Sequence, residues 1–240
     1  MDILTWCVAA ISLLLGSWIQ TALGFGMAVI AAPIIIIFQP NWVPVVITIT
    51  ALFLSLINTW DQRLSLELKS LITPFISRIP GTILGAWLLS QLSIFWMQIS
   101  VALCVFLAVI VSYFGTQFAY TPKRLALAAF ASGITGTTTS IGGPPMALVM
   151  QHGNPKTVRA NLSLYFSYSC IVSLIAYAYM GLLNSEIFYS AISFLPVCLL
   201  GFVSGKKARN YVDAGRFRPL LLLLCSVSAG IAFIGAIIKY

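Results

Sequence analysis

Charged residues are scarce in this chain. Only 8% of its 240 residues are charged, whereas an ordinary globular domain has roughly 25%. None stands between Asp2 and Asp61. Because so few ionised groups cannot cover the surface of a soluble fold, this scarcity excludes a soluble enzyme, a nucleic-acid-binding protein and a disordered scaffold. With 60% apolar residues and a mean hydropathy of +1.01, the composition predicts an all-α polytopic membrane protein.

Residues that ligate metals or act as nucleophiles are equally sparse. His152 is the only histidine. Five cysteines each stand alone in an apolar run, without a CxxC or Cys/His spacing, and such cysteines behave as small hydrophobic residues. There is no Walker loop and no Ser/His/Asp or Cys/His set. We therefore expect no metal, no cofactor, no catalytic residues and no enzymatic activity.

Hydropathy and Gly/Pro breaks divide the chain into apolar stretches. These are residues 3–23, 27–38, 42–60, 70–92, 95–118, 125–140, 145–151, 160–183, 187–205 and 217–238. A full crossing needs about 20 residues, so 27–38 and 145–151 are too short. Both follow a glycine-rich segment. This pattern predicts helices that stop inside the membrane, turn and resume, which is tolerated where the backbone is buried in protein or lines a cavity.

The two breaks recur at a regular distance. Gly24 and Gly142 lie 118 positions apart, and the segment Pro80–Gly85 resembles Pro196–Gly201 at a shift of 116. We interpret the chain as a duplication, with residues 1–120 and 121–240 as the two membrane repeats. Each repeat would contain a broken or re-entrant helix pair and three longer transmembrane helices. Chance similarity between apolar segments is the alternative.

The positive charges favour an inverted arrangement of the two repeats. With five segments in each half, eleven Lys and Arg residues fall on one side of the membrane and one on the other. Parallel repeats would divide them seven against five. The positive-inside rule therefore favours inverted repeats with both termini in the periplasm. Inverted repeats with discontinuous helices are typical of secondary transporters that bind substrate near the bilayer midplane.

The first break supplies candidate binding residues. Glycine permits a sharp turn and close approach of a ligand to the backbone. A helix that begins after Gly26 would present its unpaired N–H groups to an anion. The candidates here are Gln20, Gly24, Phe25 and Gly26. Close packing of small residues between helices is the alternative explanation.

The second break carries consecutive hydroxyl residues in an apolar context. Its candidates are Thr138, Ser140, Gly142, Gly143 and Pro144. Because neighbouring hydroxyls point in different directions, we expect some of them to face a polar cavity. The alternative is that they bond to carbonyls one turn earlier in the same helix. Proline suits the first turn of a helix, and a half-helix starting here would again present N–H groups to an anion.

Arg78 is the remaining candidate. It lies about nine residues inside an apolar stretch, and a charge at that depth usually marks a functional site. Its planar guanidinium suits carboxylate, sulfonate or phosphate groups. Extension of the side chain to the cytoplasmic headgroups is the alternative.

The two breaks also carry a resemblance to a known family. Gly24-Phe25-Gly26 with Pro33, and Gly133, Gly136 and Gly142-Gly143-Pro144-Pro145 followed by Asn154-Pro155-Lys156, resemble the TauE/SafE family of sulfite exporters, also called toluene-sulfonate uptake permeases. The resemblance implies a secondary transporter of the bacterial inner membrane. Its substrates would be sulfite or organosulfonates such as sulfoacetate, taurine or isethionate. The first break departs from the commoner, denser glycine run by having Phe25 and Met27.

The residues and the resemblance lead to one expected mechanism. Two half-helix amino ends would meet near the midplane and hold an anion, with donors from Gln20, Thr138, Ser140 and Arg78. One bundle would then move against the other to alternate access. The alternatives are a transporter of a small carboxylate or another anion, and a passive anion channel. The expected partners are a small anion and the lipid bilayer, without nucleic acid; a homodimer is left open.

Overall fold

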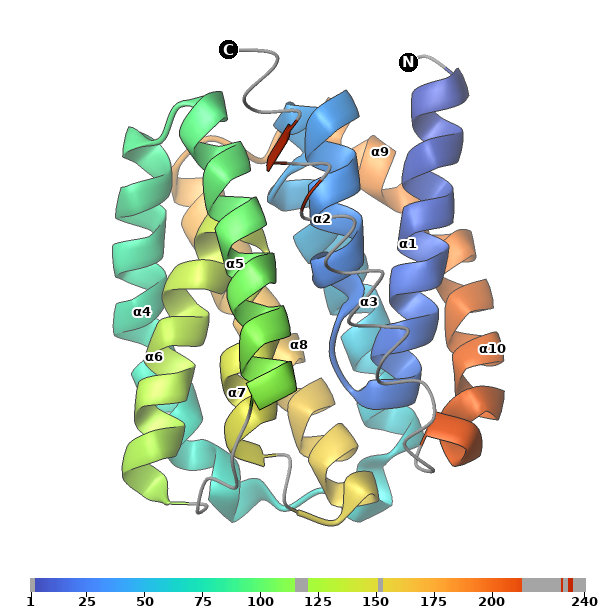
Figure 1. Cartoon of the computed structure of the whole chain (residues 1–240), viewed down its shortest axis with the longest axis vertical. Coiled ribbons are helices and arrows are strands. Elements are labelled where there is room, and N and C mark those ends of the chain that lie inside the picture. Colours follow the sequence, from blue (N-terminus) through green and yellow to red (C-terminus); the bar gives the residue numbers. More distant parts are fainter. Residues whose placement is uncertain (1–2, 115–120, 151–152, 213–229, 231–232, 235–240) are drawn as a thin grey trace.

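The computed structural model describes residues 3–114, 121–150, 153–212, 230 and 233–234, and these residues form helices without a strand (Figure 1). Four helical segments are long and apolar enough to cross a membrane: Ile3–Leu23, Leu68–Gln91, Pro155–Tyr179 and Ser185–Arg209. The predicted all-helical, multi-pass membrane architecture is thus confirmed. The last predicted stretch, 217–238, lies outside the described residues, as do Arg216, Arg218 and Lys239.

The first predicted interruption is present. Helix α1 (Ile3–Leu23) ends before Gly24, and α2 (Met27–Phe38) begins after Gly26. The two glycines have φ angles of 95° and 119°, a left-handed region that side chains with a Cβ rarely adopt. In Figure 1, α1 runs from the upper end toward the lower end, and α2 returns beside it.

Three helices follow in the first half of the chain. They are α3 (Val45–Asp61), α4 (Ile72–Gln91) and α5 (Ile94–Phe114), with short 3-10 turns at Pro40–Trp42, Arg63–Ser65 and Leu68–Leu71. These bounds agree closely with the predicted stretches. Successive helices alternate in direction between the two ends of the molecule (Figure 1).

The second predicted interruption separates α6 (Pro122–Thr139) from α7 (Gly143–Met150). Thr121 caps α6, because its side chain accepts a hydrogen bond from the Arg124 N–H. Ser140 ends the helix with a φ of 64°. In Figure 1, α6 rises from the lower end and α7 turns back toward it. This pair therefore enters from the end opposite to the one where α1 begins.

The last described helices are α8 (Pro155–Tyr179), α9 (Ser185–Ser193) and α10 (Leu195–Val212). The sequence predicted one stretch over 187–205, and the structure divides it at Phe194. Pro196 explains the division, because a proline removes one helical N–H and its ring collides with the carbonyl four residues earlier.

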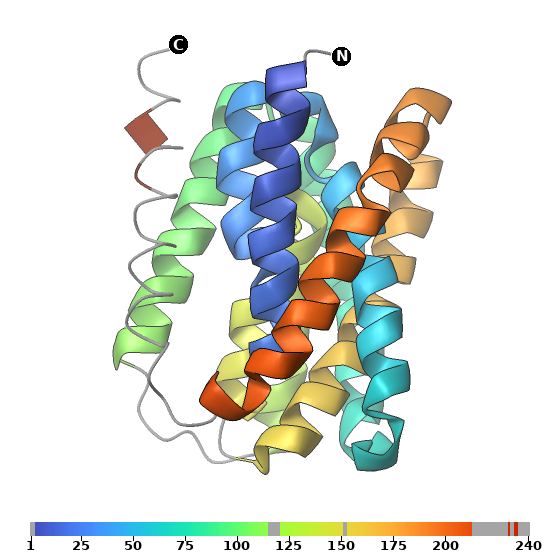
Figure 2. The ribbon, with the colours of Figure 1, turned by 90° about the vertical axis from the view of Figure 1, so that its right-hand side faces the viewer.

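Helix packing brings distant segments together. Extensive contacts join α4 to α6, α1 to α10 and α3 to α8, and Figure 2 shows α10 crossing α1 obliquely. Glycines permit two of these approaches. A Cβ atom on Gly85 would lie 2.8 Å from the Ile134 carbonyl oxygen, and one on Gly201 would lie 2.8 Å from the Leu14 carbonyl oxygen. A larger side chain at either position would push the helices apart.

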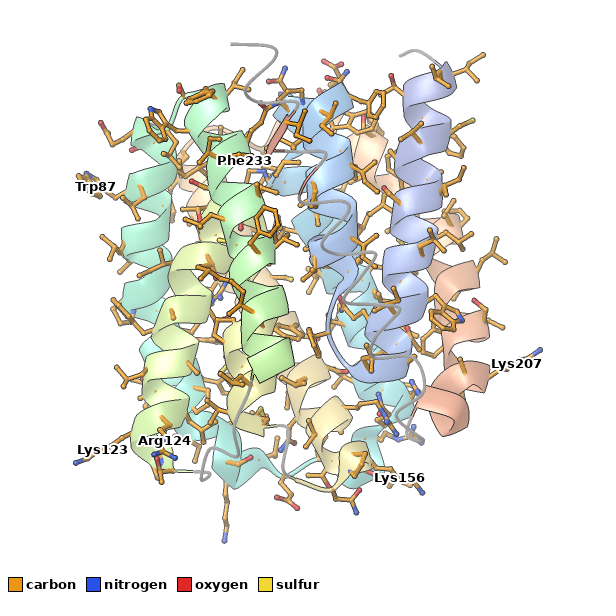
Figure 3. All side chains as sticks on the ribbon, viewed as in Figure 1. Trp87, Lys123, Arg124, Lys156, Lys207 and Phe233 are labelled. Atoms are coloured by element: carbon orange, nitrogen blue, oxygen red, sulfur yellow. The ribbon has the colours of Figure 1, made fainter. Side chains whose placement is uncertain are left out.

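Basic residues gather at one end of the bundle. Figure 3 shows Lys123, Arg124 and Lys156 at the lower end and Lys207 in the lower half, far from the start of α1. Such segregation of positive charge is expected for loops on one side of a membrane.

At the same end, Arg209 ties α10 to α1 and α3. Its Nη1 lies 2.7 Å from Asp61 Oδ2, and its Nη2 donates to Asn58 Oδ1 at 3.0 Å. Its Nε donates to the Thr21 carbonyl at 3.1 Å. Lys206 also pairs with Asp61. All three guanidinium nitrogens of Arg209 therefore have acceptors, one of them a carboxylate.

Candidate functional site

Both helix interruptions border a single cavity of about 50 Å³. Six of the predicted residues line it: Gln20, Gly26, Arg78, Ser140, Gly142 and Gly143. One water molecule needs roughly 10–15 Å³ of cavity volume, so this cavity has room for on the order of four water molecules or for a small anion. The two breaks, far apart in sequence, thus meet at one polar hollow.

Arg78 is the only charged residue among the described residues that line this cavity. Its side chain is buried, with 2% of the residue exposed, so it does not extend to the headgroups. Arg78 Nη1 donates to two oxygens of Ser132, the backbone carbonyl oxygen and the side-chain Oγ, the latter at 3.0 Å. Arg78 Nη2 donates to Ser173 Oγ at 3.0 Å. Helices α6 and α8 therefore hold the guanidinium of α4 with neutral oxygens.

The charge of Arg78 has no counter-ion within the described part of the chain. The ion pairs found there involve only Asp61, which lies at the end of α3. In addition, the Arg78 Nε is buried without a hydrogen-bond partner. A buried charge is normally paired, since removing it from water is costly. Among the described residues, the charge of Arg78 is therefore not compensated by a carboxylate.

Ser132 connects Arg78 to the second interruption. Its Oγ donates to the Gly142 carbonyl at 2.6 Å. At two nearby glycines, Gly136 and Gly142, a side chain would collide with Arg78 or with Ser132. A Cβ on Gly136 would lie 2.9 Å from both Nη atoms of Arg78, and one on Gly142 would lie 2.9 Å from Ser132 Oγ. The glycine-rich motif thus makes room for the arginine and its serine.

Ser140 fixes the turn of the second interruption against α3. Its Oγ donates to the Pro44 carbonyl at 2.8 Å and lies 3.2 Å from Thr48 Oγ1. Helix α7 then begins at Gly143 and includes Pro144 in its first turn, as expected. The first N–H groups of a helix have no partner within it. Gly142 and Gly143, which stand before the two prolines of α7, line the cavity.

The first interruption contributes its residues unequally. Gly26 lines the cavity, together with Ala28 of the first turn of α2. Gly24 packs instead against α8, where a Cβ would lie 3.2 Å from the Arg159 Cα. Phe25 lies against the second interruption, because a Cβ on Gly143 would be 3.2 Å from the Phe25 Cβ. The two breaks are thus in direct contact.

Comparison with known proteins now decides the family. The family model "Sulfite exporter TauE/SafE" matches residues 8–231. The chain belongs to the TauE/SafE family. No curated protein and no solved structure matches it. Membership confirms the resemblance noted in the sequence and supports a membrane transporter of the sulfite-exporter type.

The hydroxyl run of this TauE/SafE protein is mostly satisfied within its own helix. Thr138 Oγ1 donates to the carbonyls of Ile134 and Thr135, at 2.9 and 3.2 Å, and Thr139 Oγ1 donates to that of Thr135 at 2.8 Å. Thr138 does not line the cavity, whereas Ser140 does. Bonding within the helix, the alternative considered above, accounts for the two threonines.

Three serines at this site of the TauE/SafE chain were not predicted. Ser169 and Ser173 line the cavity, and Ser132, which stands directly before Gly133, bonds to Arg78. Spacing is the signal that could have found two of them. Positions four apart share one face of a helix, so Ser169 and Ser173 form a polar strip on α8, and both line the cavity.

Proposed function

We propose that this protein is a secondary transporter that carries a small sulfur-containing anion, sulfite or an organosulfonate, across the bacterial inner membrane. One observation carries the proposal: a buried guanidinium, Arg78, faces the cavity between the two interruptions and has no carboxylate partner among the described residues. An incoming anion would supply the missing charge. Membership of the TauE/SafE family supports sulfur chemistry for that anion.

The surroundings of Arg78 favour an oxyanion. Arginine is always protonated and offers several directed donors. The amino ends of α2 and α7 would add backbone N–H groups from the lining residues Gly26, Ala28, Gly142 and Gly143. In this proposal Arg78 supplies the net charge, and the half-helices supply short-range hydrogen bonds. The aliphatic parts of Val29 and Ala51 close the remaining wall.

Alternating access would rest on the two inverted repeats proposed for residues 1–120 and 121–240. The packing of the described helices supports this pairing. Gly85 brings α4 against α6, and Gly201 brings α10 against α1. These two contacts are counterparts under the shift of 116 between the Pro80–Gly85 and Pro196–Gly201 segments. Movement of one set of helices against the other would open the cavity to each side in turn, with the basic end in the cytoplasm.

Reconstitution tests the proposal. Purified protein in liposomes should take up radiolabelled sulfite in a saturable manner, and unlabelled sulfite or a small sulfonate trapped inside should accelerate uptake by exchange. Protein-free liposomes are the control. Equal competition by acetate would reassign the substrate to small carboxylates, and non-saturating currents would indicate a channel. No uptake of sulfite or of any small sulfonate would overturn the proposal.

A further inference from the structure

Two of the residues that line the cavity each have a buried polar atom without a hydrogen-bond partner among the described residues. The two atoms are the Nε of Arg78 and the Oγ of Ser169. Both residues are buried, with 2% and 3% exposed. Buried polar groups are nearly always paired, and an unpaired one costs stability. A ligand in the cavity that accepts hydrogen bonds from both atoms would remove this cost.

The neighbouring polar groups are already occupied. Ser132 Oγ bonds to Arg78 and Gly142, and Ser173 Oγ bonds to Arg78. Ser140 Oγ bonds to the Pro44 carbonyl. Gln20 Nε2 donates to Ser55 Oγ at 3.0 Å. Each thus has a protein partner already. Among the described residues that line the cavity, Arg78 Nε and Ser169 Oγ are the buried donors without a partner, one charged and one neutral.

The net charge of the cavity is close to one. Arg78 is its only ionised residue within the described chain. The positive ends of α2 and α7 carry partial charge, but the carboxyl ends of α1 and α6 lie only a few residues before them. These opposite dipole ends largely offset each other at each interruption. One guanidinium therefore balances one negative charge.

We infer that the cavity selects a monovalent tetrahedral oxyanion over a divalent one of the same size, an inference that rests on the proposed function. One oxygen accepts from Arg78 Nε, and a second accepts from Ser169 Oγ. A divalent anion would bring a second, uncompensated charge out of water, which carries a large desolvation penalty. The form of sulfite that binds is thus singly protonated bisulfite. Short sulfonates, which carry one permanent charge, are ligands of the same class.

Methanesulfonate and sulfate form a matched pair of probes. In both anions, the oxygens surround a tetrahedral sulfur. Methanesulfonate has a methyl group where sulfate has its fourth oxygen, so methanesulfonate carries one negative charge and sulfate carries two. Each is added as an unlabelled competitor to proteoliposomes that take up radiolabelled sulfite. We expect methanesulfonate to halve uptake at a concentration at least about tenfold lower than sulfate does, the difference that about 1.4 kcal/mol produces. Equal or stronger inhibition by sulfate would overturn the inference.

Ser169→Ala tests the second contact, with Ser12→Ala as the matched control. Ser12 is equally buried, but its hydroxyl bonds to the Ala9 carbonyl of its own helix, and it does not line the cavity. We expect Ser169→Ala to raise the half-inhibitory concentration of methanesulfonate about tenfold. Ser12→Ala should leave it unchanged. An unchanged value for Ser169→Ala, or the same rise in both variants, would remove Ser169 from the binding site.

Thermal stabilisation in detergent gives a second measurement if Ser169→Ala transports too slowly to assay. Methanesulfonate should raise the Tm of the wild-type protein more than sulfate does at equal ionic strength, and this difference should shrink in Ser169→Ala. The two proposals can fail separately. Sulfite uptake with equal inhibition by both probes overturns only the selectivity for monovalent anions, whereas no uptake and no stabilisation by any probe overturns both.

Discussion

Arg78 and Arg209 are both shielded arginines at helix contacts, but they differ in what surrounds their charge. Arg209 joins α10 to α1 and α3, and Asp61 neutralises it at 2.7 Å. Within the described chain, Arg78 bonds only to neutral serine oxygens, and its Nε has no partner there. The Arg209 cluster thus contains its own carboxylate, whereas the described surroundings of Arg78 contain none.

This difference separates structural from functional charge. A carboxylate-paired arginine holds helices together and gains little from an added anion. An arginine held only by neutral groups keeps its positive potential for a ligand. The cavity beside Arg78 is where such a ligand has room. Under the proposed function, Arg209 stabilises the helix packing and Arg78 binds the anion.

Arg78→Ala should have the largest effect on transport. Loss of a buried charge partner costs about 2–5 kcal/mol, so sulfite uptake should fall at least about 30-fold. Arg78→Lys should recover little, because an ammonium lacks the directed Nε donor. Initial uptake rates in proteoliposomes measure both effects, with Arg209→Lys as the control that keeps its charge outside the cavity. Normal uptake by Arg78→Ala would show that transport does not need the Arg78 charge, and the proposed difference in role between Arg78 and Arg209 would be wrong.

Gly142→Leu should also impair transport without preventing membrane insertion. Even the Cβ of an alanine at this position would lie 2.9 Å from Ser132 Oγ and 3.0 Å from the Ser132 carbonyl oxygen. The larger side chain would displace Ser132, and with it Arg78. We expect uptake to fall at least about tenfold, on the order of one lost charged hydrogen bond. Membrane yield is the control; near-normal uptake would show that the turn does not position Arg78.

Arg209→Ala should lower stability and leave the substrate KM unchanged. It removes the partly buried partner of Asp61 and the donors to Asn58 and Thr21, a loss of about 2 kcal/mol. The Tm in detergent measures the effect. The double variant Asp61→Asn with Arg209→Gln should recover part of the loss, because only the exposed charge of Lys206 is then left without its partner. A shift in KM without a drop in Tm would place Arg209 in the transport pathway.

Lys206→Ala should have the smallest effect. Lys206 shares Asp61 with Arg209, but 53% of its side chain is exposed to solvent. Exposed ion pairs contribute roughly 0–1 kcal/mol, so the Tm should stay close to that of the wild type. A loss of Tm as large as that of Arg209→Ala would mean that both cations share the structural role equally.

Local patterns predicted most of the helices and both interruptions. Residues 27–38 form a helix with the predicted bounds, because Gly24 and Gly26 adopt positive φ angles that favour glycine. Six of the ten predicted site residues line the cavity. Thr138 does not, since its hydroxyl bonds to its own helix. The direction of a hydroxyl depends on rotamer and neighbours, which sequence spacing does not specify.

The division between α9 and α10 shows a similar limit. Pro80 remains inside the continuous helix α4, whereas Pro196 is the second residue of α10, just after the interruption at Phe194. The same residue type in similar segments thus has two outcomes. A proline favours an interruption but does not by itself specify one, because neighbouring groups can compensate for the lost helical hydrogen bond.

By itself, the sequence determined the apolar stretches, their two interruptions and the position of a lone arginine deep in one of them. These properties follow from hydropathy, glycine conformation and the scarcity of charge, which are local. Only the tertiary structure decided what surrounds that arginine. The serines that hold Arg78 lie 54 and 95 positions away in sequence. Ser169 on α8 completes the cavity, because the packing of α4, α6 and α8 brings these isolated side chains to one place.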